Sequence, residues 1–138
     1  MSIDLVRRLY DAFNARDVAA LRDLCHPEVE LYALTASLAG REGPYRGHDG
    51  VVAYLGDVGR VWEEMEATPR QVRMHGDEIF IIGRLYARSP ALGVRDLPVA
   101  WTWSLRDGRF FRGEVHEDPR RAALRAGWLS PPEPSRPG

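Results

Sequence analysis

Apolar residues three and four positions apart dominate the first half of the chain. This spacing predicts three helices, at about residues 2–13, 17–24 and 48–62. Ser2 and Asp17 are the expected N-caps of the first two helices, and His48 and Asp49 those of the third.

From about residue 67 onward, apolar and polar residues alternate with the period of a strand. Alternation predicts four strands in this part of the chain, at residues 71–75, 78–88, 97–106 and 109–117. A short earlier strand is predicted at residues 29–34. Residues 35–47 are expected to be a loop. A last helix follows Asp118 as N-cap and ends at Gly127. Helices first and an antiparallel meander afterwards predict the α+β class.

Strand alternation also predicts which side chains face the core. The inner face of the strand at 97–106 is expected to carry Leu97, Val99, Trp101, Trp103 and Leu105. The inner face of the next strand is expected to carry Phe111, Gly113, Val115 and Glu117. Thr102, Ser104 and Arg112 then lie on the opposite side of the sheet.

The strand at 78–88 is apolar on both faces around Ile79 and Ile81, which predicts cover from the core on one side and from a partner subunit on the other. Small residues on the adjacent strand permit close approach, so we expect a homodimer packed sheet to sheet. Gly83 and Gly113 in mid-strand indicate bends. A bent sheet closed by helices is a cone that can hold a ligand.

The composition is that of an ordinary soluble domain. The chain has 138 residues, of which 44% are hydrophobic and 28% charged, enough for one buried core. A formal charge of −1 gives no cationic excess, so we expect neither nucleic acid nor membrane as a partner. The charged N-terminus is unlike a secretion signal, which favours a cytoplasmic location.

One domain is expected over residues 1–128. Residues 129–138 contain four of the ten prolines and are predicted to be a disordered tail. The single cysteine, Cys25, excludes an internal disulfide, and the histidines show no metal-ligand spacing. We expect no metal and no other cofactor.

Short motifs occur in a fixed order along the chain: residues 26–30 (HPEVE), 45–51 (YRGHDGV), 83–84 (GR), 98–103 (PVAWTW), 105–109 (LRDGR) and 118–127 (DPRRAALRAG). In this order they resemble the nuclear transport factor 2-like superfold, and within it the SnoaL-like branch, over about residues 3–128. The resemblance implies a strongly curved, mixed but mainly antiparallel sheet that forms a cone, with the N-terminal helices packed on its concave face. It specifies function poorly, because the superfold hosts enzymes and non-catalytic binders.

Three activities of the superfold can be compared with this chain position by position. The tyrosine and aspartate of ketosteroid isomerases fall at Leu9 and about Leu31. Of the Asp–Arg–Asp set of limonene-epoxide hydrolases, Arg84 matches the arginine, while the carboxylates fall at Tyr86 and Val115. SnoaL-type cyclases also require an acid near Val115. The resemblance therefore implies a pocket without the familiar catalytic carboxylates.

Arg84 and Glu117 are the candidates for catalysis. The resemblance implies that Arg84 points into the cavity, where a guanidinium must be paired with an acceptor. Arg84 then either holds an anionic or carbonyl group of a ligand, with a glutamate as general base, or forms a structural ion pair at the rim. The alternative for Glu117 is to cap the final helix.

The predicted ligand-binding residues are Glu30, Tyr32, Tyr86, Val99, Trp101, Trp103 and Val115. The alternatives are structural: the tryptophans as core, and the first-strand residues as edge-strand surface. His116 is predicted to face outward and to have no catalytic role. The sequence thus predicts a small-molecule-binding SnoaL-like protein for an apolar or polycyclic ligand. Its activity would be that of a cofactor-independent isomerase, cyclase or hydrolase of secondary metabolism, or it would be a non-catalytic binding or scaffold protein.

Overall fold

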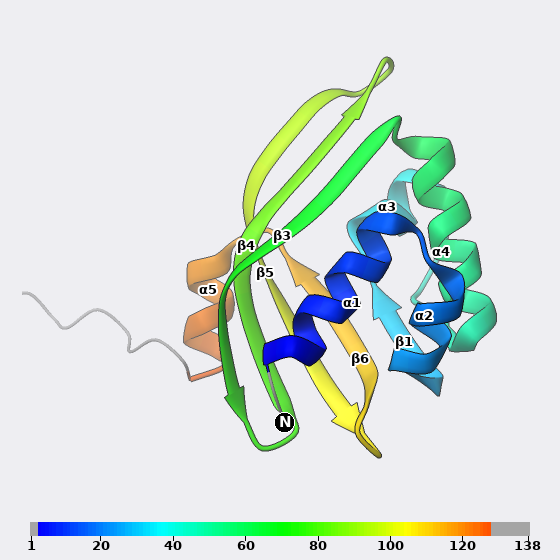
Figure 1. The fold of residues 1–138 in the computed structure, drawn as a ribbon. Coiled ribbons are helices and arrows are strands. Elements are labelled where there is room, and N and C mark those ends of the chain that lie inside the picture. Colours follow the sequence, from blue (N-terminus) through cyan, green and yellow to red (C-terminus); the bar gives the residue numbers. More distant parts are fainter. Residues whose placement is uncertain (1–2, 128–138) are drawn as a thin grey trace, which may run out of the picture.

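A six-stranded sheet forms the centre of the protein. In the computed structural model, which describes residues 3–127, its strands lie in the order β2-β1-β6-β5-β4-β3 (Figure 1). The strands are β1 (Cys25–Tyr32), β2 (Tyr45–Arg46), β3 (Glu64–His75), β4 (Glu78–Ser89), β5 (Gly93–Arg106) and β6 (Arg109–His116). Neighbouring strands are antiparallel, except that β1 runs parallel to β6. The α+β class and the mixed, mainly antiparallel sheet are confirmed.

Helices cover both faces of this sheet. The helices are α1 (Ile3–Ala15), α2 (Val18–Leu24), α3 (Leu34–Leu38), α4 (Gly47–Val61) and α5 (Pro119–Arg125). Figure 1 shows α1, α2 and α4 on one side of the sheet and α5 on the other. The N-terminal helices on the concave face are therefore confirmed.

The predicted N-caps Asp17 and Asp118 are present, whereas the caps expected from His48 and Asp49 are not. Asp17 accepts from the Ala20 backbone N–H, and Asp118 accepts from that of Arg121, both at 3.1 Å. At the start of α4 no side chain caps the helix; His48 Nε2 instead lies 3.0 Å from the Cys25 carbonyl. The expected Ser2 cap and the tail at 129–138 lie outside the described residues.

The predicted faces of β5 are confirmed. Val99, Trp101 and Trp103 are buried in the main core, under the N-terminal helices, and Val115 of β6 is half-buried against it. Thr102 lies on the opposite side, where its hydroxyl contacts His116 Nε2 at 2.9 Å. The outward direction predicted for His116 is therefore correct.

The inner face of β6 was predicted wrongly at its start. A register shift between Ser104 and Leu105 makes Leu105 pair with Phe110, so that Phe111 is the extra residue of a bulge. Phe110 is fully buried, whereas the Phe111 ring lies outside against His26 at 5.4 Å. A strict alternation cannot show this shift, because one extra residue moves every preceding side chain to the other face.

The strand β4 is apolar on both faces because each face has cover from this same chain. Ile79 and Ile81 are buried in the main core. Phe80 packs on the other side in a small cluster that contains Ala122 and Ala123 of α5. The argument that Ile79 and Ile81 need a partner subunit is therefore wrong, and the sheet-to-sheet homodimer stays a prediction.

Two stretches are more ordered than predicted. The stretch at 35–47 was expected to be a loop, but it contains most of α3 and the short strand β2. The strand β3 begins at Glu64, and the β4–β5 hairpin extends beyond the body of the sheet (Figure 1). Of these segments, α3 contributes Leu34 and Thr35 to the wall of a cavity, and the early part of β3 contributes Met65.

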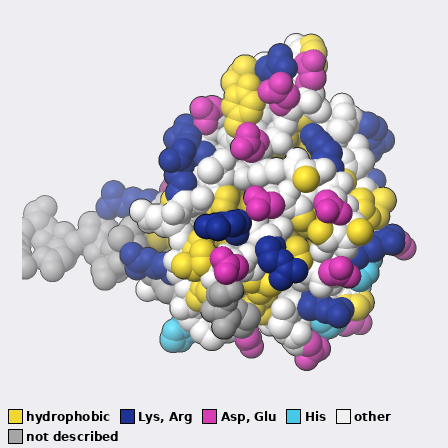
Figure 2. Space-filling view, viewed as in Figure 1, with side chains coloured by type: hydrophobic (Ala, Val, Ile, Leu, Met, Phe, Trp, Pro, Cys, Tyr) yellow, Lys and Arg dark blue, Asp and Glu magenta, His cyan; other side chains and the backbone are white. Residues whose placement is uncertain are grey.

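Charged side chains of both signs are intermixed on the face of the molecule seen in Figure 2. Exposed ion pairs also join neighbouring strands. Arg88 Nη2 lies 2.9 Å from Glu64 Oε1 across β3 and β4, and Arg84 Nη2 lies 3.0 Å from Asp96 Oδ1 across β4 and β5. Exposed pairs of this kind contribute little to stability.

Gly113 leaves room for the Trp103 side chain. A Cβ atom at position 113 would lie 2.3 Å from Trp103 Cζ3, a distance that no stable contact allows. The indole therefore lies flat over the β6 backbone, and its Nε1–H donates to Tyr10 Oη of α1 at 3.0 Å. The bend expected at Gly113 stays a prediction, and the structure shows this close contact between neighbouring strands instead.

We predict that Gly113→Ala destabilises the protein by about 1–3 kcal/mol, because the added methyl displaces the buried Trp103 indole. Urea unfolding measures the change. Gly56→Ala is the matched control, since nothing lies within 4 Å of a Cβ there and the residue is in the middle of α4. That variant should gain about 0.5–1 kcal/mol. Equal stability of the two variants would contradict the packing described here.

Candidate functional site

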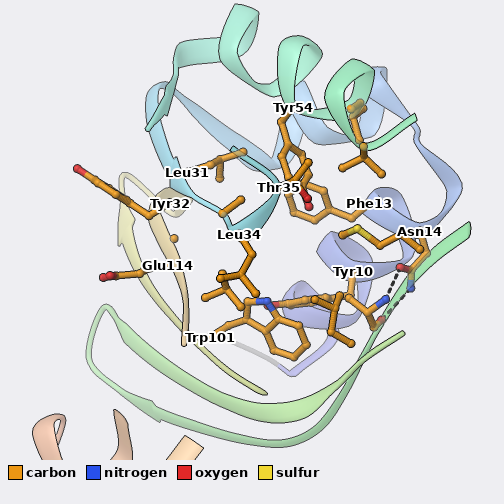
Figure 3. A pocket seen from close by; sticks show the side chains of 18 of the residues that line it. Tyr10, Phe13, Asn14, Leu31, Tyr32, Leu34, Thr35, Tyr54, Trp101 and Glu114 are labelled. Atoms are coloured by element: carbon orange, nitrogen blue, oxygen red, sulfur yellow. Dashed lines mark hydrogen bonds between the residues drawn. The ribbon is translucent and has the colours of Figure 1, made fainter. Parts of the chain in front are cut away.

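A cavity lies between the N-terminal helices and the concave face of the sheet. It encloses about 80 Å³ of space open to the centres of water molecules. One water needs only about 15 Å³ by this measure, so the cavity has room for more than a single solvent molecule. Side chains from α1, α3, α4 and strands β1, β3, β4, β5 and β6 line it (Figure 3).

The lining is aromatic on the helical side and on the sheet side. Tyr10 and Trp101 meet edge to face with ring centroids 5.0 Å apart. Phe13 lies 5.7 Å from Tyr54, also edge to face, and 6.4 Å from Trp103. Such contacts hold the rings in fixed orientations. The cavity therefore presents broad, rigid apolar surfaces to a ligand.

The polar groups of the lining are mostly neutral hydrogen-bond donors. Burial raises the pKa of Tyr10 and of Tyr54 well above the ordinary value, so both hydroxyls keep their protons at neutral pH. Tyr10 Oη accepts the Trp103 indole N–H, which leaves its own O–H available. Thr35 adds a third hydroxyl to the lining. These groups can donate to a carbonyl or another acceptor on a ligand.

The lining contains only two side chains that carry a charge at neutral pH, Arg16 and Glu114. Glu114 points away from the cavity, as does Tyr32 beside it (Figure 3). No carboxylate is therefore directed into the cavity by the residues that line it. Proton abstraction by a glutamate or aspartate at this site has no support from the geometry.

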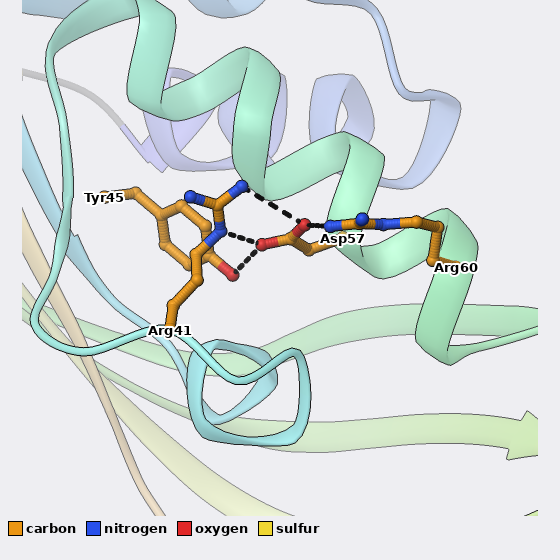
Figure 4. A network of polar contacts seen from close by, with 4 residues as sticks. All are labelled: Arg41, Tyr45, Asp57 and Arg60. Carbon is orange, nitrogen blue, oxygen red and sulfur yellow. Dashed lines mark hydrogen bonds and ion pairs between the residues drawn. The ribbon is translucent and has the colours of Figure 1, made fainter.

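A buried carboxylate outside the cavity fastens the segment between α3 and β2 to α4. Asp57 of α4 is 1% exposed and accepts hydrogen bonds from Arg41 and Arg60, and from Tyr45 Oη at 2.8 Å (Figure 4). These three donors, Arg41 foremost, lower the pKa of Asp57 to about 2 despite its burial. The Tyr45 ring in turn packs against Tyr54 with centroids 5.3 Å apart. The network thus supports one wall of the cavity.

Four of the predicted ligand-binding residues line the cavity: Tyr32, Trp101, Trp103 and Val115. Tyr32 does so while its hydroxyl points outward, where it lies 3.3 Å from Glu30 Oε2. Val99 is fully buried in the core beneath, and it is not part of the cavity wall. The tryptophans serve both as core and as cavity wall.

The remaining candidates lie outside the cavity. Arg84 is on the opposite face of β4, where its Nε donates to Asp96 Oδ1 at 3.0 Å, so its expected place inside the cone is wrong. Tyr86 shares that outer face, Glu117 is exposed after β6, and Glu30 pairs with Arg46 at 2.6 Å. A catalytic role for Arg84 and Glu117 stays a prediction that their positions do not support.

The misplacement of Arg84 has a physical cause. Its strand alternates Ile79, Ile81, Gly83 and Leu85 toward the concave side, which leaves Arg84 on the convex side. The resemblance implied the inward direction, and the alternation of the strand could not correct it, because the strand is also apolar on its convex face, where α5 covers Phe80.

Sequence reasoning assigned none of Tyr10, Tyr54, Thr35 and Arg16 to the site. Tyr54 shares the helical face of Val51, Leu55 and Val58, and this spacing is the signal that identifies it. Thr35 and Arg16 lie in a missed helix and in a turn, where the sequence gives no comparable signal.

Residues 3–127 contain no cluster of three or more His, Cys, Asp or Glu side chains that could hold a metal ion. Over the same part of the chain, no helix combines the length and the apolar character needed to span a membrane.

The cone-shaped sheet and the aromatic cavity under its helices define a protein of the nuclear transport factor 2-like class. Residues 6–113 match the SnoaL-like domain family, and the chain belongs to that family. It is also similar to an uncharacterised protein of Mycobacterium tuberculosis, at 34% identity over 91% of this chain and 95% of the other.

Two solved structures are also similar to this chain, each at 26% sequence identity. One is a nuclear transport factor 2-like protein of unknown function from Burkholderia pseudomallei, with 26% identity and a TM-score of 0.75 over 89% of this chain and 96% of that one. The other is TerC, crystallised with polyporic acid, with 26% identity and a TM-score of 0.74 over 90% of this chain and 95% of TerC.

We predict that Asp57 stabilises the protein at neutral pH and that this contribution is lost in acid. Because the pKa in the folded state is lowered to about 2, the stabilisation is fully present above about pH 4 and disappears as the pH falls toward 2. Asp57→Asn should cost about 1–3 kcal/mol at neutral pH. Urea unfolding of both proteins at several pH values measures the difference, which should shrink across this window. A difference independent of pH would contradict an ionised Asp57.

Proposed function

We propose that this protein binds a small, largely apolar aromatic molecule in the cavity between α1, α4 and the sheet. The observation that carries the proposal is the lining itself, in which Tyr10, Phe13, Tyr54, Trp101 and Trp103 surround a space with neutral donors. Pockets that bury organic ligands share this composition, with mostly apolar walls and few oriented polar groups. The crystallisation of the similar protein TerC with polyporic acid supports an organic ligand in this fold.

A cofactor-independent isomerase, cyclase or hydrolase of secondary metabolism is the second candidate. The observation in its favour is the pair of protonated hydroxyls, Tyr10 and Tyr54, on the cavity wall. Fixed donors in a site with little water can stabilise negative charge that develops on a carbonyl oxygen. No inward carboxylate accompanies them, so binding is the function that the geometry supports better.

We predict that Leu85→Trp weakens binding by at least about tenfold, because an indole at this half-buried lining position occupies the cavity. Polyporic acid is a suitable probe, and isothermal titration calorimetry gives its Kd. Val94→Trp on the β4–β5 hairpin is the matched control, since Val94 is 62% exposed and lies outside the lining. Tight binding that is equal in both variants would place the ligand elsewhere.

We further predict that Arg84→Met leaves the Kd within about twofold of the wild type. Its side chain is 42% exposed and bonds to Asp96 on the outer face, so it does not contact a ligand in the cavity. The same titration measures the effect, and thermal unfolding confirms that the variant is folded. Loss of binding in a fully folded Arg84→Met protein would restore the role predicted from the sequence.

A further inference from the structure

The turn after α1 places a positive charge on the cavity wall. Arg16 has a backbone φ of 55°, and its N–H donates to the Phe13 carbonyl at 3.1 Å, which ends the helix. The residue lines the cavity, although it is exposed to solvent. Its side chain is therefore accessible both to a ligand in the cavity and to water.

Arg16 differs from several other arginines in having no acidic partner. Arg41 and Arg60 bond to Asp57, Arg84 to Asp96 and Arg88 to Glu64. Among the described residues, no carboxylate lies within ion-pair distance of the Arg16 guanidinium. Within residues 3–127, the charge at the cavity wall is thus not neutralised by a carboxylate.

The Tyr54 hydroxyl is the second polar group without a partner in this wall. Its ring is fixed between Phe13 and Tyr45, and no hydrogen bond joins its hydroxyl to another described residue. Arg16 acts on it electrostatically, since it partly offsets the effect of burial on the Tyr54 pKa. Both residues line the same cavity, so both are available to one bound ligand.

We propose that the ligand is an aromatic acid, whose anionic group is recognised by Arg16 and by the Tyr54 hydroxyl while its rings fill the aromatic part of the cavity. This inference rests on the proposed binding function and specifies its ligand class. The Arg16 guanidinium only donates and repels a cation, and the neutral Tyr54 hydroxyl can donate to the same anionic group, so the site discriminates by charge. Glu114, the other charged lining residue, points away and cannot compensate a cationic ligand (Figure 3).

Three probes with one ring system separate charge from shape: cinnamate, cinnamamide and cinnamylamine. Calorimetric titration at low salt should give cinnamate a Kd about fivefold lower than that of cinnamamide, with cinnamylamine weakest. Added salt should reduce this preference, because Arg16 is exposed and its charge is screened. A cinnamate Kd equal to that of cinnamamide would overturn the inference.

Two variants test whether Arg16 and Tyr54 cause the preference for cinnamate over cinnamamide. Arg16→Gln should bring the cinnamate and cinnamamide Kd values close to equality, chiefly by raising the cinnamate Kd. Tyr54→Phe should weaken both by about fivefold, because both offer an oxygen acceptor. Arg8→Gln, an exposed arginine of α1 outside the lining, is the matched control and should keep the wild-type ratio.

The outcomes distinguish this inference from the function on which it rests. If cinnamamide binds and Arg16→Gln keeps the wild-type preference, a binding pocket exists but its charge recognition is not at Arg16, and the inference fails alone. If none of the three probes and no polyporic acid binds the folded wild-type protein, the proposed function fails, and this inference fails with it.

Discussion

The contact between Trp103 and Gly113 is the constraint on which the rest of the structure depends. The absence of a side chain at Gly113 lets the indole of β5 lie over β6, and the indole N–H then donates to Tyr10 of α1. One side chain therefore joins two strands and a helix. It fixes how far α1 stands from the sheet, and the cavity is the space that remains between them. The same hydrogen bond orients the Tyr10 hydroxyl, so packing and site chemistry have a common origin.

A second constraint acts on the other side of the cavity. Burial of a carboxylate is unfavourable unless donors surround it, and Asp57 has three. Its partners Arg41 and Tyr45 come from the segment between α3 and α4, so the ionised network fixes a stretch with little secondary structure of its own. Because Tyr45 packs against Tyr54, the charge stays outside the cavity while its structural effect reaches the wall. The interior thus keeps neutral donors.

The sequence predicted the helices and strands better than the residues of the cavity. Helices and strands leave a periodic pattern of apolar residues, and several cavity residues lie where no such pattern exists. Alternation along β5 places Trp101 and Trp103 correctly, because one face of that strand is bulky and the other small. It fails at Phe111, where a bulge shifts the register, and it could not decide the parity of Arg84, because β4 is apolar on both faces. The helix α3 has five residues, fewer than two turns, so no helical period could reveal it. Arg16 lies in a turn, where side-chain direction depends on tertiary structure.

The distribution of charge separates this protein from one that works by a carboxylate base. The glutamates named from the sequence, Glu30 and Glu117, lie outside the cavity wall, where Glu30 pairs with Arg46 and Glu117 is exposed to solvent. Neither carboxylate is directed toward a ligand in the cavity, so neither residue replaces an inward acid. What the wall offers instead is hydrogen-bond donation from Tyr10 and Tyr54 and the charge of Arg16. Donors of this kind stabilise negative charge on an oxygen that the ligand already carries or develops. They do not remove a proton from carbon, so a reaction of that type would need a base from the ligand or from solvent. The wall is therefore suited first to holding an oxygen-rich aromatic molecule in one orientation.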